Sequence, residues 1–248
     1  MKDLKVGIQL FTLREELGND FKGVIRELKK MGYEGLEFAG SFGDMEPAEA
    51  ADFLKSVELD ACGVHTSLGK LNNLESDVHQ YMTALGIKYC ATSMPTRVES
   101  NWVETVKEIN QTGELLKKHG ITFTYHNHDH EFKQIEGQYA LDYLYEHTEA
   151  DNVQAELDTY WIKKGGADPI AYVSKYADRL PLLHLKDMDE KTESFTELGS
   201  GIINFKEIIN QARAGATEWI IYEQDICSGS ALASAEKSIN YLKGLLSL

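Results

Sequence analysis

The sequence contains few cysteines and few prolines, and each shortage excludes a class of protein. Three cysteines in 248 residues are an odd number, at spacings that fit neither a disulfide framework nor an all-thiolate metal site. Cys62 and Cys90 fall in predicted strands, so we expect buried free thiols in a reducing compartment, the cytoplasm. No proline-, glycine- or serine-rich linker divides the chain, which predicts one domain over residues 1–248.

Basic residues and long apolar runs are also scarce. The chain has 25 Lys and Arg against 40 Asp and Glu, a net charge of −15. Nucleic acids bind through clusters of Lys and Arg, and none is present, so we expect no nucleic-acid partner. No apolar run is long enough for a signal peptide or a membrane span. Composition favours a small neutral ligand or a cation, and it leaves a homo-oligomer open.

The chain does contain a regular alternation of strand and helix patterns. Strands are predicted at 6–10, 35–39, 61–65, 88–92, the first half of 120–132, 153–158, 181–186 and 219–223. Helices are predicted at 20–31, 47–57, 74–85, 102–119, 139–147, from 168 onward, 205–212 and 231–246. Eight units of about 31 residues predict an α/β fold, a single (β/α)8 TIM barrel. The alternative, an open doubly wound sheet, lacks a GxGxxG turn after its first strand.

The most conspicuous stretch is 120–132, GITFTYHNHDHEF. It begins with the alternation of a strand that has one apolar face. It then runs into six side chains that can bind a metal, a proton or a sugar hydroxyl: His126, Asn127, His128, Asp129, His130 and Glu131. A solvated turn would use Gly, Ser, Asn and Lys more readily, so we expect this loop to lie at a functional site.

Successive side chains alternate between the two faces of each predicted strand. This alternation brings polar side chains to one rim, at the C-terminal ends of the strands. If the more apolar residues face the helices, the other face of each strand ends in a polar group: Gln9, Glu37, His65, Thr92, His126, Glu156 with Asp158, His184 with Lys186, and Glu223. In a TIM barrel this rim carries the active site. Filling of the interior layer or a hydrogen bond to a loop explains Gln9 and Thr92 slightly better than a substrate contact does, and Glu37 either contacts substrate or pairs with a cation such as Lys186. Glu156 lies one layer deeper and is expected to support the others.

Three of these groups come from adjacent strands and form a candidate metal site. Asp158, His184 and Glu223 combine hard oxygen with borderline nitrogen ligands, a set that suits Mn²⁺, Mg²⁺, Co²⁺ or Zn²⁺ at an open catalytic position. Trp161 follows soon after Asp158, and its ring is expected to form one wall of a sugar-binding pocket. The predicted substrate contacts are Gln9, Glu37, His65, His128 and Trp161.

Several motifs across nearly the whole chain carry a family resemblance. They are VGIQLFTLRE at 6–15, MGYEGLEF at 31–38, GITFTYHNH at 120–128, ELDTYW at 156–161, GGADP at 165–169, LLHLKDMD at 182–189, ELGSGIINF at 197–205 and IIYEQD at 220–225. With them the chain resembles the xylose isomerase-like barrel superfamily. Within it, the resemblance is to the sugar phosphate isomerase/epimerase group that also includes inosose dehydratases and apurinic endonucleases.

The resemblance implies a metal held at the ends of the fifth to eighth strands, where His126, Asp158, His184 and Glu223 stand here. Many members carry a glutamate at the first of these positions, so His126 is a departure, and Glu131 is its rival for the missing carboxylate. Trp161 stands where zinc nuclease relatives carry a further histidine. That difference, with the acidic composition, argues against a DNA-repair nuclease.

The implied activity is a divalent-metal-dependent isomerase or epimerase of a sugar or sugar phosphate. Such an enzyme removes a proton beside a carbonyl and passes through an enediolate. Glu223 is the expected base, His126 or Glu131 acts from the opposite face, and Lys186 assists. The same residues also suit a lyase or dehydratase acting on a keto-sugar or keto-inositol. A non-catalytic sugar-binding barrel is the third hypothesis.

Overall fold

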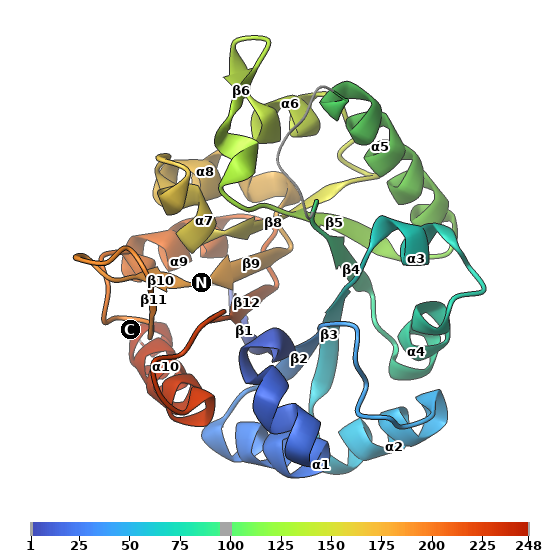
Figure 1. Ribbon diagram of the computed structural model, residues 1–248, viewed down its shortest axis with the longest axis vertical. Coiled ribbons are helices and arrows are strands. Elements are labelled where there is room, and N and C mark those ends of the chain that lie inside the picture. Colours follow the sequence, from blue (N-terminus) through green and yellow to red (C-terminus); the bar gives the residue numbers. More distant parts are fainter. Residues whose placement is uncertain (1, 95–100, 248) are drawn as a thin grey trace.

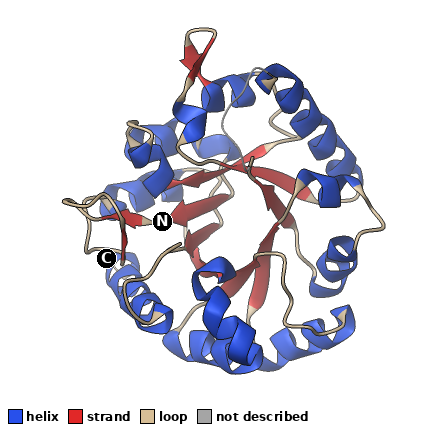
Figure 2. Ribbon diagram, viewed as in Figure 1, coloured by secondary structure: helices blue, strands red, loops and turns tan. Residues whose placement is uncertain are grey.

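Eight parallel strands close into a barrel with helices around it, in a computed structural model that describes residues 2–94 and 101–247 (Figures 1 and 2). The order around the barrel is β1-β12-β9-β8-β5-β4-β3-β2, which is sequential apart from two small hairpins. The strands are β1 Lys5–Gln9, β2 Gly35–Phe38, β3 Asp60–His65, β4 Tyr89–Thr92, β5 Thr122–His126, β8 Gln154–Asp158, β9 Leu182–Leu185 and β12 Trp219–Tyr222. The predicted TIM barrel is confirmed.

The helices lie outside the barrel, as Figure 2 shows in blue. They are α1 Arg14–Met31, α2 Pro47–Val57, α3 Leu68–Asn72, α4 Asp77–Leu85, α5 Trp102–Lys118, α6 Ala140–Glu146, α7 Thr159–Lys164, α8 Pro169–Lys175, α9 Phe205–Ala214 and α10 Ala231–Leu246. Short 3-10 turns are η1 Leu10–Leu13, η2 His130–Phe132 and η3 Ala177–Arg179. The hairpins pair β6 Gln134–Ile135 with β7 Gln138–Tyr139, and β10 Asp187–Met188 with β11 Phe195–Thr196.

The helices differ from the predicted ones in three places. The helix predicted at 74–85 begins at Asp77 as α4, and a separate short helix, α3, precedes the predicted segment. The sequence also gave no sign of α7, because it has only six residues and follows its strand without a loop. Helix α1 begins at Arg14, earlier than predicted, but it bends at Asp20, whose φ of −149° is not helical. Asp20 still caps the second half, since its Oδ1 accepts a hydrogen bond from Gly23 N at 2.9 Å.

A small apolar cluster fills the barrel near the N-terminal ends of the strands. It consists of Cys62, Leu182, Trp219 and Ile221. Gly35 makes room for the indole of Trp219, because a Cβ at that position would lie 2.5 Å from the ring. This packing closes the bottom of the barrel and leaves its polar groups at the opposite, C-terminal end.

In the fourth strand, β4, the side chains predicted to point into the barrel point outward instead. Thr92 lies beside Tyr125 in the sheet, and the ring of Tyr125 packs edge-on against Trp102 of α5. Neighbours in register on parallel strands point to the same side, so Thr92 faces the helices and the prediction for it was wrong. Ser93 contributes the polar group instead, with its Oγ 3.1 Å from His65 Nε2. The two faces of the segment 88–92 do not differ clearly in hydrophobicity, so the sequence could not show which face points into the barrel.

The three cysteines are free, as predicted, and Cys62 and Cys90 are buried. Cys227 is only half-buried. Within the two described ranges, no helix is both long enough and apolar enough to cross a membrane.

Candidate active and metal site

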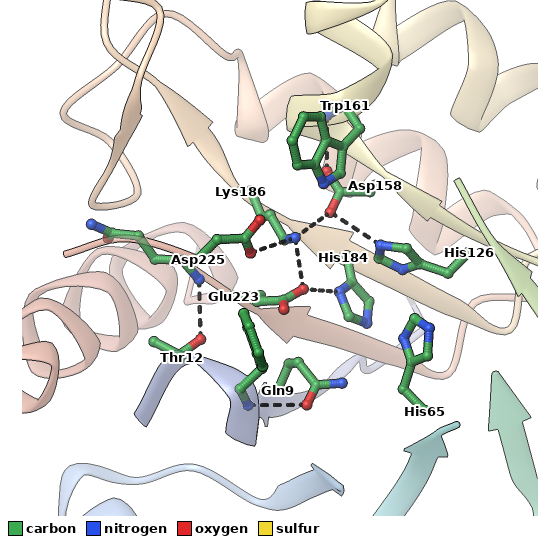
Figure 3. Close-up of polar contacts among 12 residues, drawn as sticks. Gln9, Thr12, His65, His126, Asp158, Trp161, His184, Lys186, Glu223 and Asp225 are labelled. Atoms are coloured by element: carbon green, nitrogen blue, oxygen red, sulfur yellow. Dashed lines mark hydrogen bonds and ion pairs between the residues drawn. The ribbon is translucent and has the colours of Figure 1, made fainter. Parts of the chain in front are cut away.

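Four potential metal ligands meet at the C-terminal end of the barrel, on neighbouring strands (Figure 3). His126 ends β5, Asp158 ends β8, His184 lies in β9, and Glu223 follows β12. One donor atom from each lies within 4.8 Å of the others. All four side chains are buried, and Glu223 is the most exposed at 7%. Register explains the meeting, because Asp158 pairs with His184 across β8 and β9.

A cavity of about 290 Å³ opens over this group, with a lining of Gln9, Phe11, Ala39, His65, His126, His128, Lys186, Glu223 and Asp225. It is large enough for a monosaccharide-sized ligand and is surrounded by polar groups. A larger hollow of about 740 Å³ lies at the other end of the barrel, beside Lys5, Asp60 and Trp219. We place the functional site in the smaller cavity, because catalytic groups of TIM barrels gather at the C-terminal ends of the strands.

Asp158 holds the local structure together and still presents one oxygen to the site. Its Oδ1 caps α7 by accepting a hydrogen bond from Trp161 N at 3.0 Å. Its backbone N–H donates to Asn127 Oδ1 at 3.0 Å, which ties the loop after β5 to β8. Its Oδ2 is buried and lies 3.1 Å from Lys186 Nζ and 3.7 Å from His126 Nε2. A buried carboxylate oxygen grouped with two imidazoles and a second carboxylate is the donor arrangement that a divalent cation fits.

Lys186 places a positive charge against the same carboxylates. Its Nζ lies 3.1 Å from Asp158 Oδ2, 2.8 Å from Glu223 Oε2 and 2.8 Å from Asp225 Oδ1. Burial would lower the pKa of Lys186, but the three carboxylates outweigh it and raise that pKa well above its usual value. Burial likewise opposes ionisation of Glu223, yet Lys186 and His184 hold the pKa of Glu223 well below normal. The pKa of Asp225 is raised to about 6, mainly by burial.

His184 lies at the centre of a fully buried network. Its Nε2 is 2.6 Å from Glu37 Oε2 and 3.3 Å from Glu156 Oε1, and its Nδ1 is 2.9 Å from Glu223 Oε2. Burial disfavours the imidazolium, but these carboxylates raise the pKa of His184 well above 6.5. Burial raises the pKa of Glu37 to about 7. Glu37 thus pairs with a cationic neighbour, as one of its two predictions held, but the partner is His184 and not Lys186.

Glu156 supports the site from the layer below, which is the place that its sequence position suggested. Its Oε1 lies 3.3 Å from His126 Nδ1, and its Oε2 accepts a hydrogen bond from Thr124 at 2.9 Å. Burial alone would raise the pKa of Glu156, but the hydrogen bonds with His126 and His184 lower it instead. An ionised Glu156 holds a proton on His126 Nδ1 and leaves Nε2 facing Asp158, 3.7 Å from its Oδ2.

Two further predicted substrate contacts are histidines that remain neutral. Burial lowers the pKa of His65 to about 3 and that of His128 to about 2, and nearby cationic groups add to both shifts. Both line the cavity, and His128 Nδ1 is buried without a hydrogen-bond partner among the described residues. A neutral imidazole both donates and accepts hydrogen bonds, which suits a sugar hydroxyl.

Glu131 does not join the four-ligand group, although the sequence made it the rival of His126. It is fully buried on the helix side of β5, where its Oε1 accepts a hydrogen bond from Tyr125 at 2.6 Å. Its Oε2 accepts another from His128 N at 2.9 Å, so Glu131 fixes the loop instead. His126 is the group that β5 brings to the site.

Trp161 closes one side of the site. Its ring centre lies 5.2 Å from that of His128 and 5.7 Å from Lys186 Nζ. The indole Nε1 is buried and has no hydrogen-bond partner within the described part of the chain. Gln9 lines the cavity as well, but its Oε1 accepts a hydrogen bond from Phe11 N at 3.2 Å and so also shapes the loop after β1.

Two residues that line the cavity, Asp225 and Phe11, were not predicted from the sequence. Asp225 contacts Lys186, and a signal for it existed, because it stands two residues beyond Glu223 and shares its parity. Phe11 lines the cavity with 43% of its surface exposed, and Arg14 stacks on its ring at 4.4 Å. The alternation of apolar and polar residues in β1 gives no signal for Phe11, since Phe11 lies past the end of the strand.

A family model and several known proteins match the chain. A family model described as a xylose isomerase-like TIM barrel matches residues 25–245. An inosose dehydratase from Clostridium tetani is 29% identical over 169 residues, which cover 60% of this chain and 56% of that relative. The match therefore spans little more than half of that relative's length. An inosose dehydratase from Lactiplantibacillus plantarum is 22% identical over 290 aligned residues, covering 98% of this chain and 96% of the relative.

Solved structures resemble the chain across its full length. A sugar phosphate isomerase/epimerase from Parabacteroides distasonis superimposes with a TM-score of 0.85 at 24% identity, covering 98% of this chain and 94% of that one. A structure described as L-ribulose 3-epimerase gives a TM-score of 0.72 at 15% identity, with coverage of 99% and 95%. At these identities the likeness establishes the fold alone.

Proposed function

The chain belongs to the xylose isomerase-like TIM barrel family, and we propose that it is a divalent-metal-dependent lyase that removes water from a keto-sugar or keto-inositol. The observation that carries the proposal is the meeting of His126, Asp158, His184 and Glu223 beneath a polar cavity of about 290 Å³. The names of the curated relatives support elimination, which the sequence alone had ranked second to isomerisation.

His126, Asp158, His184 and Glu223 would hold the metal. A divalent ion at this position supplies positive charge for the oxygen of a substrate carbonyl as negative charge develops there. For His184 to serve as a ligand, one of its ring nitrogens has to lose its proton, because only the neutral imidazole binds a metal.

Glu223 is the base in this proposal. Its contacts to His184 and Lys186 both involve Oε2, so Oε1 is left to accept a proton from the carbon beside the carbonyl. The side chain lines the cavity and is only 7% exposed, which keeps the proton transfer apart from bulk water.

Lys186 is placed to complete the elimination. As the carbon–hydrogen bond breaks, its electrons form the new double bond, and the hydroxyl on the next carbon leaves with its bonding pair. That hydroxyl takes a proton from the Lys186 ammonium and departs as water. Lys186 lines the same cavity as Glu223, and His65, His128 and Trp161 offer hydrogen bonds to the remaining hydroxyls.

The test is to incubate the Mn²⁺-loaded protein with a keto-inositol and with keto-sugars in D₂O. Loss of water, detected by mass spectrometry and by the absorbance of the new conjugated carbonyl, is expected with at least one of them. Exchange of the carbon-bound proton for deuterium without loss of water would overturn the lyase proposal.

The second candidate is the isomerase or epimerase that the sequence favoured. Its support is that Glu223 and His126 line one cavity from different strands, and that the Parabacteroides structure bears such a name. Deuterium exchange with a changed configuration and no loss of water is its signature. Metal-independent sugar binding with neither exchange nor turnover would indicate a non-catalytic barrel.

A further inference from the structure

Lys186 occupies an unusual position for a lysine. It is 2% exposed, and its ammonium contacts the carboxylates of Asp158, Glu223 and Asp225 at 3.1, 2.8 and 2.8 Å. Asp158 and Glu223 belong to the candidate metal-ligand group, whereas Asp225 does not. In Figure 3 the Lys186 nitrogen lies between Asp158 and Asp225, with Glu223 beside it.

The ammonium and a divalent ion require the same oxygens. A metal binds carboxylate oxygen at about 2.0–2.2 Å, and Lys186 already contacts Asp158 Oδ2 and Glu223 Oε2. With both cations against these two oxygens, they would lie only a few ångströms apart and repel each other strongly in a buried site. Occupancy by one cation therefore disfavours the other.

Asp225 gives the ammonium an alternative partner. It already contacts Lys186, its side chain is 20% exposed, and both residues line the cavity. The rings of Trp161 and Phe195 lie 5.7 and 6.0 Å from Nζ and cover the ammonium without holding it in one place. The ammonium can thus leave Asp158 and Glu223 without losing every negative partner.

We propose that Lys186 competes with the divalent ion for Asp158 and Glu223, and that Asp225 takes up the ammonium when the ion binds. The inference rests on the proposed function only in that the site binds a metal. Lys186 is a positioning residue in this role: it neutralises the carboxylates of the metal-free protein and sets the affinity for the ion.

Calorimetric titration of the metal-free protein with Mn²⁺ alone tests the proposal without any substrate. Lys186→Met removes the competitor and should bind Mn²⁺ about tenfold more tightly, or more. Asp225→Asn removes the alternative partner and should weaken Mn²⁺ binding several-fold. In the double variant the effect of Asp225→Asn should largely disappear, because Asp225 acts through the lysine. Lys164→Met, which removes a lysine paired with Glu193 outside the site, is the matched control and should bind like wild type.

The outcomes separate this inference from the proposed function. Equal or weaker Mn²⁺ binding by Lys186→Met, with wild type binding normally, overturns the competition and leaves the metal site intact. Absence of Mn²⁺ binding in every variant overturns both. If Lys186→Met does not fold, Lys186→Gln has no charge and keeps a hydrogen-bond donor, so it gives the same comparison, and Asp225→Asn must still bind more weakly.

Discussion

Several residues of the site act at once on structure and on chemistry. Asp158 caps α7 with one oxygen and presents the other to the candidate metal position. Glu223 contacts His184 and Lys186 through Oε2 and lines the cavity. Because the two oxygens of each carboxylate have different roles, a substitution that changes one atom can lower catalysis while the protein stays folded.

Glu223→Gln should abolish most of the turnover while the protein stays folded. The amide has the size of the carboxylate but cannot take a proton from carbon, so we expect kcat to fall by about 10²–10⁴. Steady-state assays of water loss measure this effect. Glu236→Gln, on the exposed surface of α10, is the control and should keep full activity. Retention of more than a tenth of the wild-type rate by Glu223→Gln would show that the base lies elsewhere.

Trp161→Phe should weaken substrate binding more than it slows the chemical step. Phenylalanine retains an aromatic wall but loses the buried Nε1–H, which has no partner among the described residues. Loss of one hydrogen bond to substrate, about 1 kcal/mol, raises KM roughly five- to tenfold with little change in kcat. Trp219→Phe, at the other end of the barrel, should leave KM unchanged. An unaltered KM for Trp161→Phe would remove the indole from the list of substrate contacts.

At the scale of the element, the segment after β9 is held by a single carboxylate. Asp187 Oδ1 accepts hydrogen bonds from Met188 N at 2.8 Å and Ile203 N at 3.1 Å. Its Oδ2 accepts from Gly199 N at 3.0 Å and Gly201 N at 2.9 Å. Gly201 is required here, because a Cβ would lie 2.2 Å from Met188 O. This loop directly follows Lys186 and so fixes the strand end that carries it.

Asp187→Asn should destabilise the protein by about 2–4 kcal/mol. The amide nitrogen cannot accept hydrogen bonds, so it leaves two N–H groups of the loop without their acceptor, each at a cost of about 1–2 kcal/mol. Urea denaturation measures the change in unfolding free energy. Asp189→Asn is a matched control, because its three hydrogen bonds all go to Oδ1, an atom that asparagine keeps. A loss below about 0.5 kcal/mol for Asp187→Asn would contradict this account of the loop.

The whole molecule separates stability from function along the barrel axis. The N-terminal end is filled by Cys62, Leu182, Trp219 and Ile221, whereas the C-terminal end gathers charged side chains that are almost completely buried. Carboxylates concentrated in this way repel one another, and Lys186 and His184 offset that repulsion in the absence of a metal. A bound divalent ion should therefore stabilise the whole fold. A homo-oligomer stays a prediction.

Mn²⁺ should raise the thermal midpoint of the wild-type protein, and a chelator should reverse the shift. At a concentration of 100 times Kd, binding to the folded state alone adds about 2.7 kcal/mol. Asp158→Asn should lose most of this gain, although asparagine can still cap α7. His147→Gln, on the surface after α6, is the control and should respond to Mn²⁺ like wild type. Equal shifts in Asp158→Asn and wild type would place the metal outside the proposed site.

The sequence by itself determined the barrel and the rim. Hydrophobic periodicity located all eight strands because each is short, buried and bounded by helices with clear spacing, and parity assigned the inward faces of seven strands. It failed at β4, where Tyr89, Cys90, Ala91 and Thr92 give no contrast between faces. The motifs also supplied the family, because they extend over most of the chain.

Only the tertiary structure decided how the charged groups pair. Lys186 could have met any of several carboxylates on the rim, and register together with burial set its contacts to Asp158, Glu223 and Asp225. Glu131 was a plausible ligand by position, but Tyr125 draws it to the outside of β5. Such choices depend on distances of a few ångströms between strands far apart in the chain, and no local pattern of residues encodes them.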